Sequence, residues 1–375
     1  MTSLHRLHDV GQSIWLDFIA RDILKNGELV ARIRDDALTG MTSNPTIFEK
    51  ALSEGDAYDE QLNGAPRGQT AWQTFELVET TDVRDACDIF RPTFDAAKGG
   101  DGFVSIEVSP GSAHSAEDTV AEAQRLWQTV GRPNVMVKVP GTAEGAIAVR
   151  RLIADGINVN ITLLFAIEAH AAIIESYLGG LEDRLKAGKP IDSIASVASF
   201  FVSRVDSEVD KRLDAAIQKM PKEAARLASL KGKAAIANAK LAYQLFLERF
   251  SGPRWDALKA KGARVQRPLW ASTSTKNPAY RDVMYVEQLI GPETVDTMPP
   301  ATIDAFRDHG EVKVTVTEGI ADAKRVITDL GAVGIQMKDV TDKLLVDGLA
   351  SFQKSFDTLV AGLEAKVGAL AGAKR

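Results

Sequence analysis

The sequence predicts an α/β fold, a single (β/α)8 TIM barrel, and three observations support this prediction. Short runs rich in β-branched and aromatic residues alternate with longer segments that have apolar residues at helical spacing. About eight such strand–helix units follow one another along the 375 residues. Several strand-like runs are apolar on both faces, as covered parallel strands are. An open doubly wound sheet stays possible, because periodicity does not show whether a sheet closes.

The strand candidates follow the chain in order. The clearest are Ile14–Phe18, Phe103–Val108, Val135–Val139, Ile157–Phe165, Val197–Val202 and Pro268–Thr273. Two weaker candidates complete the set, Leu38–Ser43 and Val295–Met298. Helical spacing is clearest over Ala116–Val130, Glu144–Ala154 and Ile167–Lys186. Strict alternation of strand and helix implies that helical crossovers join parallel strands.

Two regions of the chain are additional to the eight strand–helix units of a barrel. Asp206–Ala263 is rich in Ala, Lys, Arg and Glu, and predicts one long helix or two antiparallel helices. Residues 321–375 predict two more helices, with apolar residues at helical spacing from Leu344 to Leu363. We expect both regions to pack on the outside of the barrel. No repeat or linker indicates a second domain, so we expect residues 1–375 to form one domain with a helical insert at 206–263 and C-terminal helices at 321–375.

Composition argues against several classes of protein. The 51 acidic and 45 basic side chains leave a net charge of −6, without the basic excess typical of nucleic-acid or membrane binding. One cysteine, Cys87, and five scattered histidines do not form a metal-ligand pattern. The first residues lack the apolar run of a signal peptide, and no apolar run is long enough to span a bilayer. We therefore expect a cytoplasmic protein that binds neither nucleic acid nor a membrane.

Polar residues inside apolar strands indicate function. Lys138 is the only polar residue in Val135–Pro140, so it either snorkels from the strand end or is held away from water. Asp17 interrupts a second apolar strand, and Glu107 shares one face of a third strand with Ser105 and Ser109. A desolvated lysine can attack a carbonyl as the neutral amine, and carboxylates can move the protons that a Schiff base requires. The alternative is a buried ion-pair network of Lys138, Asp17 and Glu107, which is disfavoured because pairing seldom repays desolvation.

Hydroxyl, amide and cationic groups follow other strands. Asn160 and Thr162 share one strand face, and the segment Ser199–Arg204 ends a strand with a serine and an arginine. Ser272–Lys276 ends another strand with four hydroxyls and a lysine. Loops late in a barrel often bind phosphate, although either cation alone is more often a surface residue. Asn44 precedes a proline and predicts a helix cap, which is compatible with a substrate contact.

These motifs resemble the transaldolase family in its longer bacterial form. The matching stretches are TSNPTIF at 42–48, SIEVSP at 105–110, VMVKVPGT at 135–142, GINVNITLLF at 156–165, SFFVSRVD at 199–206, WASTSTKNP at 270–278 and TMPPAT at 297–302. The resemblance runs from about residue 11 to about residue 310. It implies a (β/α)8 barrel related to the class I aldolases by circular permutation, with neither a cofactor nor a metal.

The resemblance also implies catalytic roles. Lys138 would form the Schiff base with a ketose donor, and Asp17 would take the proton of the donor hydroxyl as the carbon–carbon bond breaks. Glu107 and Thr162 would hold a water that shuttles protons. The reaction would move a dihydroxyacetone unit from sedoheptulose 7-phosphate to glyceraldehyde 3-phosphate, giving erythrose 4-phosphate and fructose 6-phosphate in the pentose phosphate pathway.

The substrate-binding residues that the resemblance implies are Asn44, Asn160, Ser199, Arg204 and Ser272. Shorter members of the family carry an arginine two residues after the serine that aligns with Ser272. That position is Ser274 here, and we expect Lys276 to make the second phosphate contact instead. Two alternatives stay open, a fructose-6-phosphate aldolase that releases free dihydroxyacetone and a non-catalytic sugar-phosphate binding protein. Either a monomer or a homodimer is compatible with the sequence.

Overall fold

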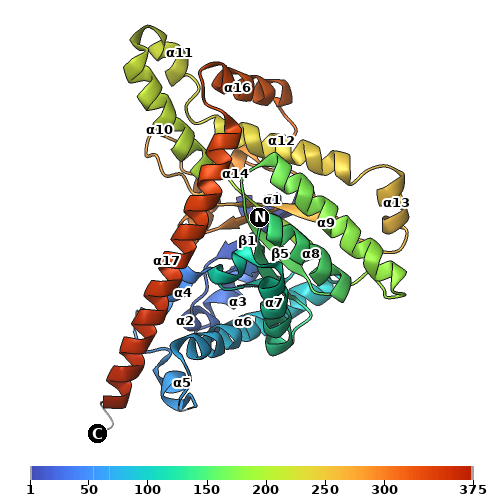
Figure 1. Cartoon of the computed structure of the whole chain (residues 1–375), viewed down its shortest axis with the longest axis vertical. Coiled ribbons are helices and arrows are strands. Elements are labelled where there is room, and N and C mark those ends of the chain that lie inside the picture. Colours follow the sequence, from blue (N-terminus) through green and yellow to red (C-terminus); the bar gives the residue numbers. More distant parts are fainter. Residues whose placement is uncertain (1, 54, 67, 373–375) are drawn as a thin grey trace.

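A closed barrel of parallel strands forms the centre of the protein (Figure 1). The computed structural model describes residues 2–53, 55–66 and 68–372. Within these ranges eight strands pair in chain order, and β8 returns to β1. Their bounds are β1 Gln12–Asp17, β2 Leu38–Thr42, β3 Phe103–Glu107, β4 Val135–Pro140, β5 Val159–Leu164, β6 Ser196–Phe201, β7 Gln266–Ala271 and β8 Thr294–Met298. The predicted barrel is confirmed, including its two weaker strands, and the open sheet is wrong.

The alternation of side chains along each strand separates the barrel interior from the layer between strands and helices. Trp15 points into the interior, where it lies against Gly40, its register partner on β2. A Cβ atom at Gly40 would lie 2.5 Å from the Trp15 indole, so only glycine leaves room for this ring. The interior is therefore a packed core below the carboxyl ends of the strands, as in other barrels of this size.

Helices cover the outside of the strands. The four longest in the first half of the chain are α6 Ala71–Ala96, α7 Ala116–Val130, α8 Ala143–Asp155 and α9 Ile167–Lys186. They pack on β3 to β6. The bounds of α7 and α9 agree with the sequence prediction. Thr142 caps α8 by accepting a hydrogen bond of 2.9 Å from the Gly145 amide. The other helices of this part are α1 Ser3–Asp9, α2 Arg21–Lys25, α3 Glu28–Asp35, α4 Pro45–Ser53, α5 Asp59–Gly64 and the 3₁₀ helix η1 Pro110–His114.

The predicted insert is more broken than expected. In place of one or two helices, the described chain forms α10 Ser203–Lys219, η2 Pro221–Glu223, α11 Ala224–Ala228, α12 Ala234–Arg249 and α13 Pro253–Lys259. Pro221 and Pro253 begin two of the short pieces, because proline removes an amide donor and cannot continue a preceding helix. Of the two long helices, α12 packs on α9 and on strand β7, so it covers the barrel between β6 and β7.

The C-terminal region forms α16 Ile320–Ala332 and α17 Met337–Gly372, as predicted. The position of α17 differs from the expectation that it packs only on the outside. Figure 1 shows it as a long red helix that passes α10 and then α4 and α5. It also contacts β5, and Ser351 and Phe352 line a cavity at the carboxyl ends of the strands. Helical spacing identifies an apolar face but not the surface that this face covers.

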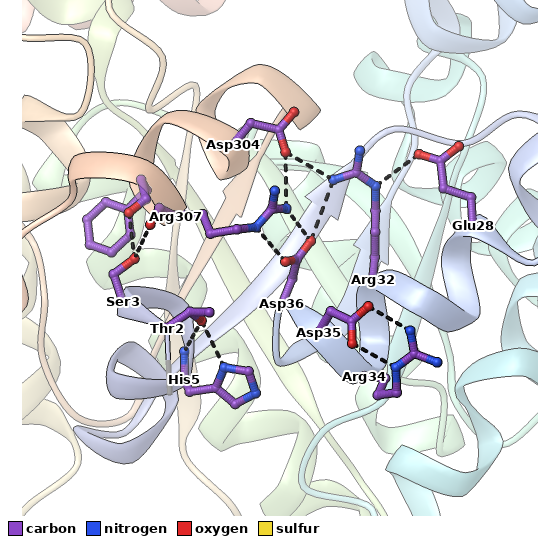
Figure 2. A network of polar contacts seen from close by, with 11 residues as sticks. Thr2, Ser3, His5, Glu28, Arg32, Arg34, Asp35, Asp36, Asp304 and Arg307 are labelled. Atoms are coloured by element: carbon purple, nitrogen blue, oxygen red, sulfur yellow. Dashed lines mark hydrogen bonds and ion pairs between the residues drawn. The ribbon is translucent and has the colours of Figure 1, made fainter.

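A polar network connects the first and last units of the barrel (Figure 2). Arg307 of α15, which spans Pro300–His309, donates hydrogen bonds of 2.7 and 2.6 Å to both carboxylate oxygens of Asp36. Arg32 of α3 lies 3.5 Å from Asp304. The Ser3 hydroxyl donates a 2.6 Å hydrogen bond to the carbonyl of Phe306. These contacts hold α1, α3 and α15 together beside the junction of β8 and β1. The remaining helix is α14 Met284–Gln288.

None of the helices formed by the described residues is both long and apolar enough to cross a membrane.

Candidate active site

A cavity of about 460 Å³ opens at the carboxyl ends of the strands. Among the residues predicted from sequence, those that line it are Asp17, Asn44, Lys138, Thr162, Ser199, Arg204, Ser272 and Lys276. The other two, Glu107 and Asn160, lie beside Lys138, because they are its register partners on the neighbouring strands β3 and β5. Parallel strands bring these residues together although they are far apart in sequence.

Lys138 is buried at the base of the cavity, with 6% of its surface exposed. Its Nζ donates a 3.0 Å hydrogen bond to Glu107 Oε2 and a 2.7 Å hydrogen bond to the carbonyl of Ser43. The ammonium therefore reaches across the interior from β4 to the end of β2. The ion pair with Glu107 exists, but the alternative three-residue network does not form as a chain of direct contacts, because Asp17 bonds elsewhere.

Asp17 ends β1 on the other side of the cavity. Its Oδ1 accepts a 2.9 Å hydrogen bond from Thr42, whose hydroxyl also lies 2.7 Å from that of Thr297. Burial raises the pKa of Asp17, and the positive charge of Lys138 offsets part of this rise. Burial likewise raises the pKa of Glu107, against the opposing effect of Lys138. Carboxyl groups with raised pKa values are suited to accept and return protons.

Amide and hydroxyl groups form a second layer of contacts below the cavity. Asn160 is fully buried; its Nδ2 donates a 3.0 Å hydrogen bond to Ser105 Oγ, and its Oδ1 accepts one of 2.6 Å from Ser199. These bonds fix the orientation of the amide. Ser43 Oγ donates a 2.9 Å hydrogen bond to the Ser105 carbonyl, which connects this layer to the loop that contacts Lys138.

Thr162 lies two residues after Asn160, next to an irregularity in the pairing of β5 that affects where its side chain points. The register between β5 and β6 shifts between Ile161 and Leu164, and Leu163 has a φ of +59°. Bulges of this kind re-aim side chains, and a positive φ in leucine costs about 1–3 kcal/mol. The Thr162 hydroxyl is buried and has no hydrogen-bond partner among the described residues. It is therefore available to a water or a substrate atom.

Asn44 has the structural role that the sequence predicted. Its Oδ1 accepts a 3.1 Å hydrogen bond from the Ile47 amide at the start of α4. Because Asn44 also lines the cavity, capping and a substrate contact are compatible. The cap uses the side-chain oxygen, and the amide nitrogen donates no hydrogen bond to the described residues.

The outer part of the cavity is cationic. Lys50 of α4 and Lys276 both line it, and Lys276 Nζ donates a 2.8 Å hydrogen bond to Ser274 Oγ. The Arg204 guanidinium lies 5.1 Å from the centre of the Phe201 ring and forms no hydrogen bond or ion pair with the described residues. Burial lowers its pKa from the usual arginine value. An arginine that lacks an acceptor partner is suited to bind an anionic group.

Ser272 lines the same cavity as Arg204 and Lys276 and lies in a strained turn. Its φ is +58°, and its hydroxyl lies 2.8 Å from that of Ser203 at the start of α10. The Ser203 amide also donates a 3.0 Å hydrogen bond to the Ser272 carbonyl. The start of α10, which carries Arg204, and the loop that carries Lys276 are therefore joined by side-chain and backbone contacts.

Sequence reasoning missed several residues of this site. Three of them contact the catalytic candidates or their partners: Thr42, Thr297 and the carbonyl of Ser43. A fourth, Phe352 of α17, lines the cavity. The first three all lie within the motifs TSNPTIF and TMPPAT, so the motifs could have indicated them. Phe352 was visible only as one apolar position of a helix. Across the described residues, no three His, Cys, Asp or Glu side chains gather in a way that could hold a metal ion.

Comparison with known proteins identifies the family. The model of the transaldolase/fructose-6-phosphate aldolase family matches residues 14–363. Transaldolase 2 of Nostoc sp. (strain PCC 7120) is 47% identical over 370 residues, which cover 97% of each chain. The transaldolase of Parafrankia sp. is 48% identical over 98% of this chain and 99% of its own. That of Thermobifida fusca is 48% identical over 359 residues, 95% of this chain and 96% of its own. The chain belongs to the transaldolase/fructose-6-phosphate aldolase family.

Proposed function

We infer that the protein is a transaldolase that moves a dihydroxyacetone unit from sedoheptulose 7-phosphate to glyceraldehyde 3-phosphate in the pentose phosphate pathway. The observation that supports this most strongly is the buried Lys138, which contacts Glu107 at the base of a cavity with a cationic outer part. The named relatives, which cover nearly the whole chain, are transaldolases. A transferase of this kind needs a lysine, proton-carrying carboxyls and phosphate-binding cations in one cavity.

The first half of the reaction attaches the donor to the lysine. Lys138 passes a proton to Glu107, which lies 3.0 Å away, and the neutral amine attacks the C2 carbonyl of the ketose. The carbinolamine then loses its hydroxyl as water, for which a proton must be supplied. Glu107 returns that proton through a water that Thr162 holds, because the Thr162 hydroxyl has no other partner in the described structure. The product is an imine between Nζ and C2.

The second half breaks and re-forms a carbon–carbon bond. Asp17 takes the proton of the C4 hydroxyl, the C3–C4 bond breaks, and its electrons move into the imine to give an enamine on Lys138. The aldose leaves with its phosphate. When an acceptor aldehyde arrives, the enamine attacks its carbonyl carbon, Asp17 returns the proton to the new hydroxyl, and hydrolysis frees the product. The raised pKa of Asp17 supports this exchange of one proton in both directions.

Substrate recognition is divided between the two layers of the site. Asn44 and Asn160 bind hydroxyls of the retained three-carbon unit, and Ser199 orients Asn160 through their 2.6 Å hydrogen bond. Arg204 and Lys276 bind the phosphate, with Ser272 between them. Bidentate contact of arginine with phosphate oxygens supplies most of the orientation, and the lysine adds a point charge.

Borohydride reduction tests the Schiff base directly. With fructose 6-phosphate present, borohydride should convert the imine into a stable secondary amine, found by mass spectrometry on the peptide that contains Lys138. Lys138→Met should abolish both the adduct and the activity, since it keeps the volume but removes the nucleophile. Absence of the adduct from the wild-type protein would refute the mechanism, and sugar-phosphate binding without an adduct would favour a binding protein.

The family description also includes fructose-6-phosphate aldolase. The two activities differ in the fate of the enamine, which reacts with an aldose in one case and is protonated and released as dihydroxyacetone in the other. With fructose 6-phosphate as donor, we expect little free dihydroxyacetone without erythrose 4-phosphate and rapid sedoheptulose 7-phosphate formation with it. Equal rates of fructose 6-phosphate cleavage under both conditions would favour the aldolase.

The phosphate contact of Lys276 is tested by substitution. Lys276→Ala should raise KM for phosphorylated donors much more than it lowers kcat, because the side chain touches the phosphate and not the reacting carbons. Lys324→Ala, which removes an exposed lysine of α16 outside the cavity, is the matched control. An unchanged KM in Lys276→Ala would exclude this contact.

We further propose that the whole chain is a single domain that acts in the cytoplasm. The packing of α12 on α9 and of α17 on α4 supports the single domain, because the extra helices share a core with the barrel. Light scattering of the purified protein distinguishes the monomer from the homodimer.

A further inference from the structure

Helix α17 contributes part of the cavity wall, although it lies outside the eight strand–helix units. Ser351 and Phe352 line the cavity together with Lys138 and Arg204. The Phe352 side chain is buried, with 7% of its surface exposed. A buried aromatic ring beside a substrate cavity is rigid and occupies a defined volume, so it limits the size of what can bind.

The position of α17 is determined by contacts that follow Phe352 along the helix. Ser355 Oγ lies 2.8 Å from Thr46 Oγ1 on α4, and the Phe356 ring centre lies 4.9 Å from that of Trp72. Near the end of the helix, Lys366 forms an ion pair of 2.9 Å with Asp59. Helix α4 itself begins after Asn44 and lines the cavity. The wall formed by α4 and α17 is therefore one packed unit.

One turn before Phe352, Gly348 brings the backbone of α17 close to the site. A Cβ atom at this position would lie 3.0 Å from Leu163 Cδ2 and 3.7 Å from Arg204 Nη1. The Arg204 guanidinium is consequently flanked by the Phe201 ring and by the α17 backbone. Since the Arg204 guanidinium forms no hydrogen bond or ion pair with the described residues, this packing is what positions the side chain.

We propose that Gly348 and Phe352 of α17 determine substrate specificity by setting where Arg204 lies and how long a sugar phosphate fits. The proposal rests on the proposed function, in which the sugar is held at Lys138 through C2 and at Arg204 through its phosphate. Between two attachment points, chain length decides which donors fit without strain. Phe352 restricts the space available for a longer chain, and Gly348 keeps the guanidinium free of a neighbouring side chain.

Removal of the Phe352 ring tests the length restriction. Phe352→Ala should raise the ratio of kcat/KM for sedoheptulose 7-phosphate to that for fructose 6-phosphate by about tenfold, since one carbon in a shaped pocket is typically discriminated by that much or more. Phe356→Ala is the matched control, because it removes the same ring from the next turn, where it packs on Trp72. Equal ratios in the two variants would overturn the proposal.

A larger side chain at Gly348 tests the positioning of Arg204. Gly348→Val should raise KM for fructose 6-phosphate about tenfold or more while the borohydride adduct with unphosphorylated dihydroxyacetone still forms on Lys138. Gly362→Val, on the same helix where nothing lies within 4 Å of an added Cβ, controls for the cost of valine in a helix. Equal KM values in both variants would overturn this role. If Gly348→Val does not fold, the Phe352→Ala ratio decides the proposal.

These outcomes are separable from failure of the proposed function. If the Schiff-base mechanism were wrong, the wild-type protein itself would give no adduct. If only the role of α17 were wrong, the wild-type adduct would form and the Phe352 and Gly348 variants would match their controls.

Discussion

The buried carboxyl of Asp296 should make the stability of the folded protein depend on pH near neutrality. Asp296 on β8 is fully buried; its Oδ1 accepts a 2.8 Å hydrogen bond from Thr273, and its Oδ2 has no partner among the described residues. Burial raises its pKa from the ordinary value of 3.8 to about 7, and the Thr273 hydrogen bond offsets only part of the rise. No cation among the described residues opposes this rise in pKa, unlike at Asp17 and Glu107.

The sign and size of the effect follow from proton linkage. A carboxyl with a raised pKa in the folded state contributes stability at low pH, and this contribution is lost as the pH rises toward and through the folded-state pKa. A pKa difference of one corresponds to about 1.4 kcal/mol. Between pH 5 and pH 8.5, ionisation of Asp296 should therefore lower the free energy of unfolding by about 3 kcal/mol.

Asp296→Asn isolates this effect, because asparagine keeps the oxygen that accepts from Thr273 but does not ionise. The free energy of unfolding of both proteins is measured by urea titration at pH 5 and at pH 8.5. Subtracting the wild-type value from the variant value at each pH cancels the contribution of the other titrating groups, which both proteins share. The advantage of the Asn variant should grow by about 3 kcal/mol over this range. Asp192→Asn, at an exposed position, is the matched control. A constant difference between Asp296→Asn and the wild type would refute the raised pKa.

Three further substitutions test the packing around the barrel. Gly40→Ala should lower the free energy of unfolding by about 1–3 kcal/mol in urea titrations, because the added methyl group would lie 2.5 Å from the Trp15 indole; an unchanged midpoint would show that the ring moves freely. His170→Leu should leave the free energy of unfolding unchanged or increase it. Both ring nitrogens of His170 are buried without partners in the described structure, and burial lowers the pKa of the ring to about 4. A large loss of stability measured by calorimetry would mean that the ring has a hydrogen-bonding partner. Ser199→Ala should lower kcat, and Ser199→Thr should restore part of it, because the Ser199 hydroxyl orients Asn160. Equal kcat values in the two variants would exclude a role of this hydroxyl in orienting Asn160.

Local pattern was sufficient to predict the strands and most of the helices. All eight strands lie where β-rich runs occur, and α7 and α9 have the predicted bounds, because alternation and helical spacing report directly on which faces are buried. The pattern was insufficient in the insert, where a high content of helix-forming residues hid the breaks at Pro221 and Pro253. Composition measures helix propensity, whereas proline acts at a single position.

The sequence by itself determined which residues are the candidates for the chemistry, because a lysine and two carboxyls inside apolar strands are costly to bury unless they serve a reaction. It did not determine how they pair. Only the tertiary structure decided that Lys138 contacts Glu107 and the Ser43 carbonyl, while Asp17 contacts Thr42. Strand register and barrel closure set these distances, and both depend on contacts between residues far apart in the chain. The placement of α17 over the cavity has the same origin. The apolar face of an amphipathic helix shows that the helix must pack on another surface, but which surface it packs on depends on the rest of the fold.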